Sequence, residues 1–206
     1  MKVSRDVRQV FTGVLAGLAL AVPLYAQVSK DPPVPPVRRD DPAPMEADAK
    51  VPLSGPDRQL METMARAGIA EVEVGKIAES NAANPDVKKF ARQMVEDHGK
   101  ANRELEELAA KKGVKLPTEP DAGQRERIAD VKGQSGAAFD QAYVDDAAIK
   151  DHLAAKELFE KTAKNAEDLD LRAYAQKNLP VIDHHLEMAK QIGNTLAQGS
   201  KAASPS

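Results

Sequence analysis

The sequence predicts an all-α fold, a bundle of four long helices. Three observations support this prediction: apolar residues recur at helical spacing across residues 57–198, no segment there alternates as a β-strand does, and helix-start and helix-stop signals are present. The chain has 206 residues, enough for one domain of ordinary size with appendages. We therefore expect a single helical domain flanked by additional segments.

The first 26 residues are typical of a secretory signal peptide. Basic residues precede an apolar run from Val10 to Leu24, and the small residue Ala26 is followed by polar Gln27, which predicts cleavage after Ala26. An uncleaved anchor is the less favoured alternative, because the run is shorter than the ~20 residues of a spanning helix. We expect a periplasmic or otherwise exported protein with no stable membrane span after cleavage.

Residues 27–56 are predicted to form a disordered linker. Eight prolines lie between Asp31 and Pro56, with almost no apolar residue larger than valine. Such a segment buries too little surface to offset the entropy lost on ordering. The tail at 199–206 is small and polar and is also expected to be disordered, which leaves residues 57–198 as the folded domain.

The first two long helices have clear end signals. One is predicted from about Pro56 to Ser80, with the proline in its first turn. Asn84-Pro85-Asp86 supplies an N-cap, a proline and an acidic residue that start the next helix. This helix is expected to end at Lys112, before Gly113.

The other two long helices are predicted at about 137–166 and 169–196, with a kink at Pro180. Both hairpin joints are too short for anything but antiparallel neighbours. The middle connection, residues 113–136, has room for a short helix around 125–131. At ~3.3 Å per residue it is long enough to span a helix of ~42 Å. Two hairpins joined by a long crossover form the ferritin-like arrangement of a four-helix bundle.

Composition excludes several kinds of site. The chain has no cysteine, so it cannot form a disulfide, a thiolate metal site or a thiol nucleophile. It has 29 basic and 32 acidic residues and no basic stripe with interleaved aromatics, so no nucleic-acid partner is expected. No phosphate loop, nucleophile elbow or pair of catalytic acids is present. We predict no catalytic residue, and an enzyme is not favoured.

One ionisable residue falls on the apolar face of each long helix. A rotation of 100° per residue places four of them inward, while the neighbouring His184 points outward. All four lie in the middle third of their helices, which predicts one polar layer at mid-bundle. These residues are Glu71, His98, His152 and His185.

Several short motifs resemble a bacterial family known only as domain of unknown function 4142. They are Glu71-Val-Glu-Val-Gly-Lys-Ile-Ala78, Lys89-Phe-Ala-Arg-Gln-Met-Val-Glu-Asp-His98, Phe139-Asp140-x-x-Tyr143, His152, and Pro180 followed by His185-Leu186. The resemblance covers about residues 57–196. It implies a ferritin-like bundle in an exported protein, and members are often named putative membrane proteins. It supplies no established activity, substrate or catalytic residue.

A di-iron centre is not expected in this layer. Such centres take Glu-x-x-His from two helices, and every histidine here has Val or Ile three positions earlier. Three imidazoles and one carboxylate can instead hold a single divalent Zn, Cu, Ni or Fe ion. Asp145 or Asn102 would then stand behind the ligands.

The alternative is a Glu/His layer that fixes helix register by hydrogen bonds and holds no metal. This is the commoner role of an inward histidine. The protein would then be a non-catalytic envelope-interaction or stress protein that uses its outer faces. Helical phase does not give ligand distances, so both hypotheses stay open, as do a protein partner and a homo-oligomer.

Overall fold

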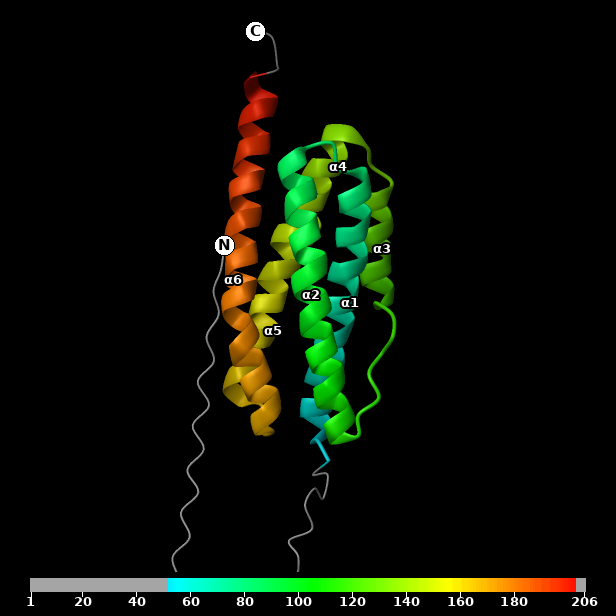
Figure 1. Cartoon of the computed structure of the whole chain (residues 1–206), viewed down its shortest axis with the longest axis vertical. Helices are drawn as coiled ribbons and strands as arrows, with labels where there is room; N and C mark the ends of the chain where they lie inside the picture. The colour runs from blue at the N-terminus through cyan, green and yellow to red at the C-terminus, as the bar shows by residue number, and fades with distance from the viewer. Residues whose placement is uncertain (1–51, 203–206) are drawn as a thin grey trace, which may run out of the picture. The chain divides into compact units, whose positions relative to one another are not determined.

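The part of the chain that the structure describes, residues 52–202 of a computed structural model, is built of helices and contains no strand (Figure 1). The elements are α1 (Gly55–Asn81), α2 (Pro85–Lys112), α3 (Ala122–Lys132), α4 (Gly136–Ala142), the π-helical segment η1 (Tyr143–Lys150), α5 (Asp151–Asn165) and α6 (Leu169–Ala202). The predicted all-α class is confirmed. The predicted signal peptide and most of the predicted linker lie outside the described residues. Within the described range, no helix combines the length and apolar character that a membrane crossing requires.

Local signals set most helix ends where the sequence predicts them. The Asn84 side chain accepts hydrogen bonds from the backbone N–H groups of Asp86 and Val87 at the start of α2. The same helix ends at Gly113, whose φ of 68° is left-handed and favours glycine. The predicted boundaries of α2 are therefore confirmed.

Two predicted domain boundaries need correction. Ser54 caps α1, which begins at Gly55, and the Leu53 side chain is buried, so these residues belong to the bundle and not to a linker. At the other end α6 continues to Ala202, past the predicted limit at residue 198. Propagation of an existing helix adds one hydrogen bond for each residue and outweighs the poor helix propensity of Gly199 and Ser200. The proline at position 180 does not end the helix.

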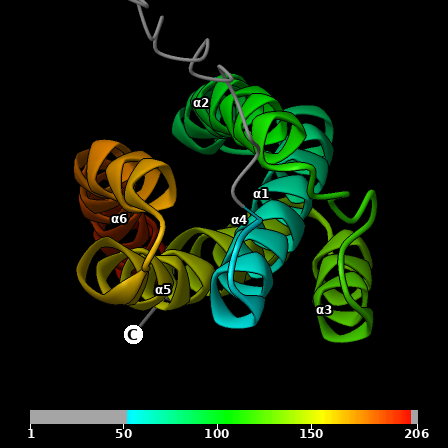
Figure 2. The same cartoon turned by 90° about the horizontal axis from the view of Figure 1, so that it is seen from below.

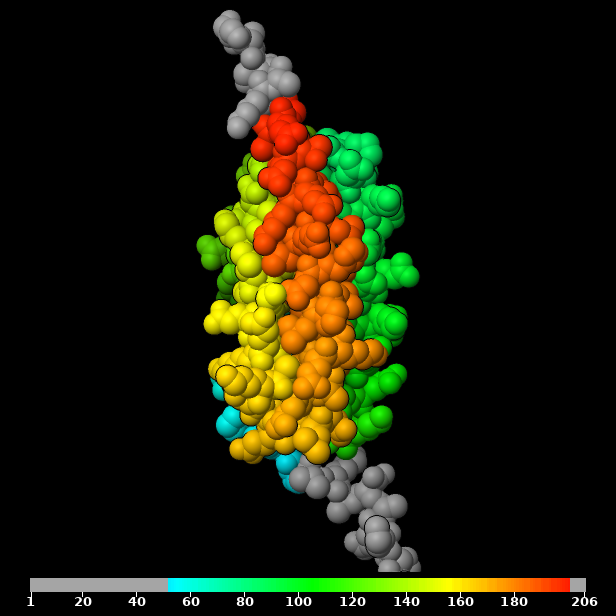
Figure 3. All heavy atoms as spheres, turned by 90° about the vertical axis from the view of Figure 1, so that its left-hand side faces the viewer, coloured from blue at the N-terminus to red at the C-terminus, as the bar shows by residue number. Residues whose placement is uncertain are grey.

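The long helices pack as two antiparallel pairs. α1 lies against α2, and α5 lies against α6. α4, η1 and α5 follow one another without a break, so the third predicted helix is present but carries a π segment in its middle. Seen along the bundle, α3 packs outside the other helices, against α1 (Figure 2). α6 is flanked by α5 on one side and by α2 on the other (Figure 3).

The apolar core is divided into two clusters. One contains Phe90 and Phe139, near the joint between α1 and α2. The other contains Met61, Leu105 and Leu171, toward the opposite end of the helices. Along α2, along the run from η1 to α5 and along α6, the inward histidines lie between residues of the two clusters. A polar layer therefore separates the two halves of the core.

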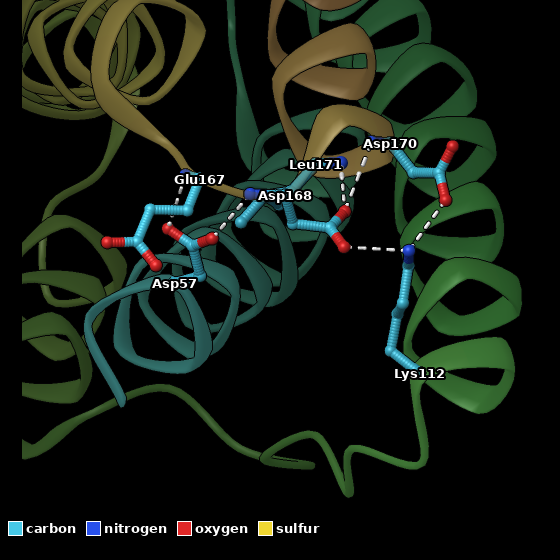
Figure 4. Close-up of polar contacts among 6 residues, drawn as sticks. All are labelled: Asp57, Lys112, Glu167, Asp168, Asp170 and Leu171. Atoms are coloured by element: carbon cyan, nitrogen blue, oxygen red, sulfur yellow. Dashed lines mark hydrogen bonds and ion pairs between the residues drawn. The ribbon is translucent and has the colours of Figure 1, made fainter. Parts of the chain in front are cut away.

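Buried Asp57, near the start of α1, holds the turn between α5 and α6 (Figure 4). Its carboxylate accepts the backbone N–H groups of Glu167 and Asp168, at 3.3 and 2.8 Å. Asp168 in turn accepts the Leu171 N–H and forms an ion pair of 2.7 Å with Lys112 at the end of α2. N–H groups at a helix start have no partner within the helix, so these contacts satisfy them and tie the two hairpins together.

Candidate metal centre

Three histidines from three helices meet at the middle of the bundle. His98 comes from α2, His152 from the first turn of α5 and His185 from α6. Their ring centroids are 5.4, 5.4 and 5.5 Å apart, so the rings form a nearly equilateral triangle. One nitrogen of each ring lies within 4.8 Å of the others. The structure thus brings together the three histidines that helical phase placed inward.

Burial separates these residues from the fourth histidine. His152 and His185 are 0% exposed, whereas His98 keeps a partly exposed edge. His184 is exposed, although it is adjacent to His185 in the chain. The predicted division into three inward histidines and one outward histidine is therefore confirmed.

The separation between two of the imidazoles fits a shared ion. Nε2 of His98 lies 3.3 Å from Nε2 of His152. A tetrahedral ion with metal–nitrogen bonds of about 2.0–2.1 Å holds neighbouring nitrogens about 3.3 Å apart. The same distance also allows a hydrogen bond if one ring donates and the other accepts. The two rings are therefore placed either to share a metal ion or to form a hydrogen bond with each other.

A carboxylate that the sequence did not single out holds the third ring. Oδ2 of Asp97 is 2.9 Å from Nε2 of His185 and accepts a hydrogen bond from it. Asp97 is 35% exposed and belongs to α2, whereas His185 belongs to α6. The adjacency of Asp97 and His98 in the chain does not reveal this contact, because the carboxylate pairs with a histidine on another helix. Only the packing of α2 against α6 could have identified this residue.

Glu71 is buried beside His152 but is not part of the three-nitrogen group. Its Oε1 lies 3.6 Å from Nδ1 of His152, beyond hydrogen-bond distance. The predicted metal set therefore divides into three imidazoles that converge and one carboxylate next to them.

Two imidazole nitrogens of the layer have no hydrogen-bond partner within the described residues. They are Nδ1 of His152 and Nδ1 of His185, and both are buried. A buried polar atom without a partner costs about 1–3 kcal/mol, so such atoms are rare in folded proteins. The site leaves two of them within one layer.

Burial keeps the three imidazoles neutral. It lowers the pKa of His98 well below its usual value, and the neighbouring rings of His152 and His185 add to the effect. Burial, with a smaller effect of His185, lowers the pKa of His152 to about 4, and the backbone of Ala147 opposes the shift. The pKa of His185 is lowered by burial, which Asp97 partly opposes. Neutral imidazole is the form that binds metal, so the lone pairs of all three rings are available near pH 7.

Burial acts on Glu71 in the opposite sense. It raises the pKa of this carboxyl well above 4.5, and the negative charge of Asp151 adds to the effect, while Arg127 opposes it. Without a cation nearby, the carboxyl is therefore protonated over a wider range of pH. A cation within the layer would favour its ionised form.

The π segment η1 ends two residues before His152. In η1 the Asp151 N–H bonds to the Asp146 carbonyl, five residues back, so each residue advances the helix by a smaller angle than in an α-helix. A constant rotation of 100° therefore misplaces residues across this segment. Asp145, predicted to stand behind the ligands, is instead partly exposed and accepts a hydrogen bond from Gln141.

Asn102, the other residue predicted to stand behind the ligands, lines a cavity next to the layer together with His98 and His185. It lies against Gly68 of α1. A Cβ atom added at Gly68 would be 1.9 Å from Oδ1 of Asn102. An alanine here would force the Asn102 side chain to move, so Gly68 accommodates that side chain where α1 and α2 approach each other.

Comparison with known proteins gives a family and a fold. The sequence profile of a family described as Domain of unknown function (DUF4142) matches residues 42–192. No curated protein matches the sequence. A solved structure, "Crystal structure of DUF305 fragment from Deinococcus radiodurans", is similar with a TM-score of 0.60 and 12% sequence identity, over 71% of this chain and 99% of that one. At this identity the likeness concerns the fold alone.

Proposed function

The chain belongs to the family described as Domain of unknown function (DUF4142), and we propose that its bundle binds one divalent transition-metal ion through His98, His152 and His185. The observation that carries the proposal is the convergence of three neutral imidazole nitrogens within 4.8 Å at the centre of the fold. Imidazole donors suit Zn, Cu, Ni and Fe. The absence of thiolates from the chain directs the choice to these ions at a nitrogen site.

The hydrogen-bond partners assign a donor atom to each ring. Asp97 occupies Nε2 of His185, so this ring binds through Nδ1, which is otherwise without a partner. His98 and His152 bind through the Nε2 atoms that face each other. Glu71 then lies behind His152. A movement of its carboxylate by about 0.6 Å toward the ring would bring Oε1 to about 3.0 Å from Nδ1, whose N–H would then donate to it. Carboxylates placed in this way fix ring orientation and raise ligand basicity.

A metal-free hydrogen-bonded layer is the competing explanation. The contact between Asp97 and His185 and the short distance between His98 and His152 are consistent with it. It leaves the buried Nδ1 atom of His185 without a partner, whereas the metal site uses this atom as a donor. That difference favours the metal centre over the network and over a purely non-catalytic interaction protein.

We assign the helices to the ferritin-like arrangement, with residues 113–135 as the crossover between the hairpins. Two antiparallel pairs with the polar layer at mid-height support this assignment.

We also propose that the protein is exported and cleaved after Ala26. The basic and apolar N-terminal sequence supports export, and intact-mass measurement of the protein recovered from a bacterial periplasm would test it.

Metal analysis of protein purified without chelator tests the central proposal. Wild type is expected to carry about one transition-metal ion per chain, and His98→Ala with His185→Ala should abolish binding. His184→Ala is the matched control, since this exposed neighbour should leave metal content unchanged. A content below about a tenth of an equivalent, after reloading with Zn, Cu, Ni and Fe in turn, would exclude the metal centre.

A further inference from the structure

We infer that the bound ion keeps one open coordination position, facing a cavity that admits a ligand of two or three non-hydrogen atoms. This inference rests on the proposed metal centre and extends it from metal binding to small-ligand binding at the metal. Three features carry it: the number of donors, the size of the cavity and the polar groups that line it.

The protein supplies three donors to the ion. Among residues 52–202 the group of converging metal-binding side chains consists of the three histidines. Glu71 is on the far nitrogen of His152, and Asp97 is engaged by the far nitrogen of His185. Ions of this class take at least four ligands, and sites with three protein ligands leave the fourth position to water or substrate. The remaining position must therefore be filled from outside the helices.

A cavity of about 40 Å³ lies next to the layer. The residues around it that carry polar groups are Glu71, Asp97, His98, Asn102, Tyr174, Asn178 and His185. One water occupies about 10–15 Å³ on this measure, so the cavity has room for about three waters or one triatomic molecule. It is too small for an aromatic ring or an amino acid.

Two carboxamides supply hydrogen bonds to a ligand in this cavity. The Asn178 amide nitrogen donates to the Tyr174 carbonyl of its own helix, which leaves the amide oxygen for other partners. The Asn102 carboxamide makes no hydrogen bond to any residue in the described part of the chain. Met64 and Phe159 line the same cavity and are apolar. A mixed lining of this kind suits a small neutral molecule or a singly charged anion.

Azide is the probe that fits these dimensions. Wild type is first loaded with Cu(II) and its metal content is measured, and azide is then titrated while the charge-transfer absorption of the ion is followed. We expect saturable binding of one azide per ion. Benzoate, which has nine non-hydrogen atoms, should produce no change. A loaded protein whose spectrum does not respond to azide would show a saturated ion and overturn the inference.

Variants at Ala101 test whether the cavity is the binding place. Ala101→Leu should fill it, leave metal content within about twofold of wild type and weaken azide binding by about tenfold or more. Ala101→Val, which adds less volume, should give a smaller loss of the same sign. Ala110→Leu is the control, because Ala110 is an exposed alanine of the same helix. Azide affinity that is equal in wild type and both Ala101 variants would place the ligand elsewhere and contradict the inference.

The two proposals fail at different steps. If the wild-type protein takes up no metal, the metal centre is excluded before azide is added, and the open position is excluded with it. If metal is bound but azide is not, the metal centre stands and only the open position is lost.

Discussion

Asp57 and Asp140 occupy equivalent places in the two hairpins, and each caps the turn of the other hairpin. The Asp57 carboxylate accepts hydrogen bonds from two N–H groups of the turn between α5 and α6. The Asp140 carboxylate, in α4, accepts the N–H groups of Ala83 and Asn84, at 2.9 and 2.8 Å, from the turn between α1 and α2. Both aspartates are buried, at 2% and 3% exposure. The bundle is therefore closed at both ends by the same contact.

The equivalence of the hairpins explains the π segment. Asp57 precedes the turn residue Asn84 by 27 positions, whereas Asp140 precedes its counterpart Asp168 by 28. The second hairpin thus holds one additional residue between the same two contacts. The helix absorbs it in η1, where the hydrogen bonds span five residues instead of four.

Removal of the Asp140 carboxylate should destabilise the bundle without affecting the metal layer directly. Asp140→Ala leaves the two turn N–H groups without their charged acceptor, at an expected cost of about 2–3 kcal/mol in the free energy of unfolding. Urea unfolding followed by circular dichroism measures this loss. Asp130→Ala, at an exposed position of α3, is the control and should change stability by less than about 0.5 kcal/mol. Equal stability of the two variants would contradict the stabilising role of the contact between Asp140 and the turn.

Deletion of one residue from η1 should be tolerated. Without Asp146 the run from α4 to α5 can continue as an α-helix with both flanks in place, so the free energy of unfolding should fall by no more than about 1 kcal/mol. Deletion of Glu157, an exposed residue of α5, should cost more than about 3 kcal/mol, because it rotates the rest of the helix away from the core. Thermal melting of the two proteins compares them. A larger loss for the η1 deletion would show that η1 is not a one-residue insertion.

Two glycines of the first hairpin should respond to alanine in opposite directions. Gly68→Ala places a Cβ against Asn102 and should lower the free energy of unfolding by about 1–3 kcal/mol. In Gly99→Ala the added Cβ contacts only the end of the Arg103 side chain, at 3.7 Å. This substitution should raise the free energy of unfolding by about 0.5–1 kcal/mol. Adding Asn102→Ala to Gly68→Ala should recover part of the loss. Additive effects in that double variant would mean that the two side chains do not interact.

The stability of metal-free protein should rise with pH between about 4 and 6.5. In this range the unfolded chain binds protons on its histidines, whereas folded His152, with a pKa of about 4, does not, so the folded state gains stability as pH increases. His98 and His185 act in the same direction, because burial also lowers their pKa. The contribution is fully present above the usual histidine pKa and is lost as pH falls toward 4. His152→Gln should reduce the slope by up to about 1.4 kcal/mol per pH unit.

Glu71 acts against that slope. Its pKa is raised in the folded state, so the folded protein binds the extra proton above pH 4.5 and loses stability as pH increases. Glu71→Gln should therefore steepen the rise in stability with pH. Unfolding curves of both variants at several pH values, in the presence of a chelator, measure the two effects. Identical slopes for wild type and both variants would contradict the pKa shifts.

Much of the fold follows from local sequence signals. Asn84-Pro85-Asp86 and Gly113 define α2 because capping depends only on residues adjacent in the chain. The sequence predicts the start of α1 at about Pro56, one residue after its observed start at Gly55, and it does not predict the π segment. A π segment depends on the match between two hairpins that are distant in sequence, and no local pattern in residues 143–150 encodes it.

For the candidate site, too, local sequence and tertiary packing each determine a different part. By itself the sequence determined which groups face inward, since helical phase is local: it selected His98, His152 and His185 and excluded His184. The tertiary structure decided which atoms meet. It brought three nitrogens within 4.8 Å, paired Asp97 with His185 across two helices and left Glu71 behind His152. Distances between helices depend on how whole faces pack, and a close approach such as that at Gly68 is set by both partners at once.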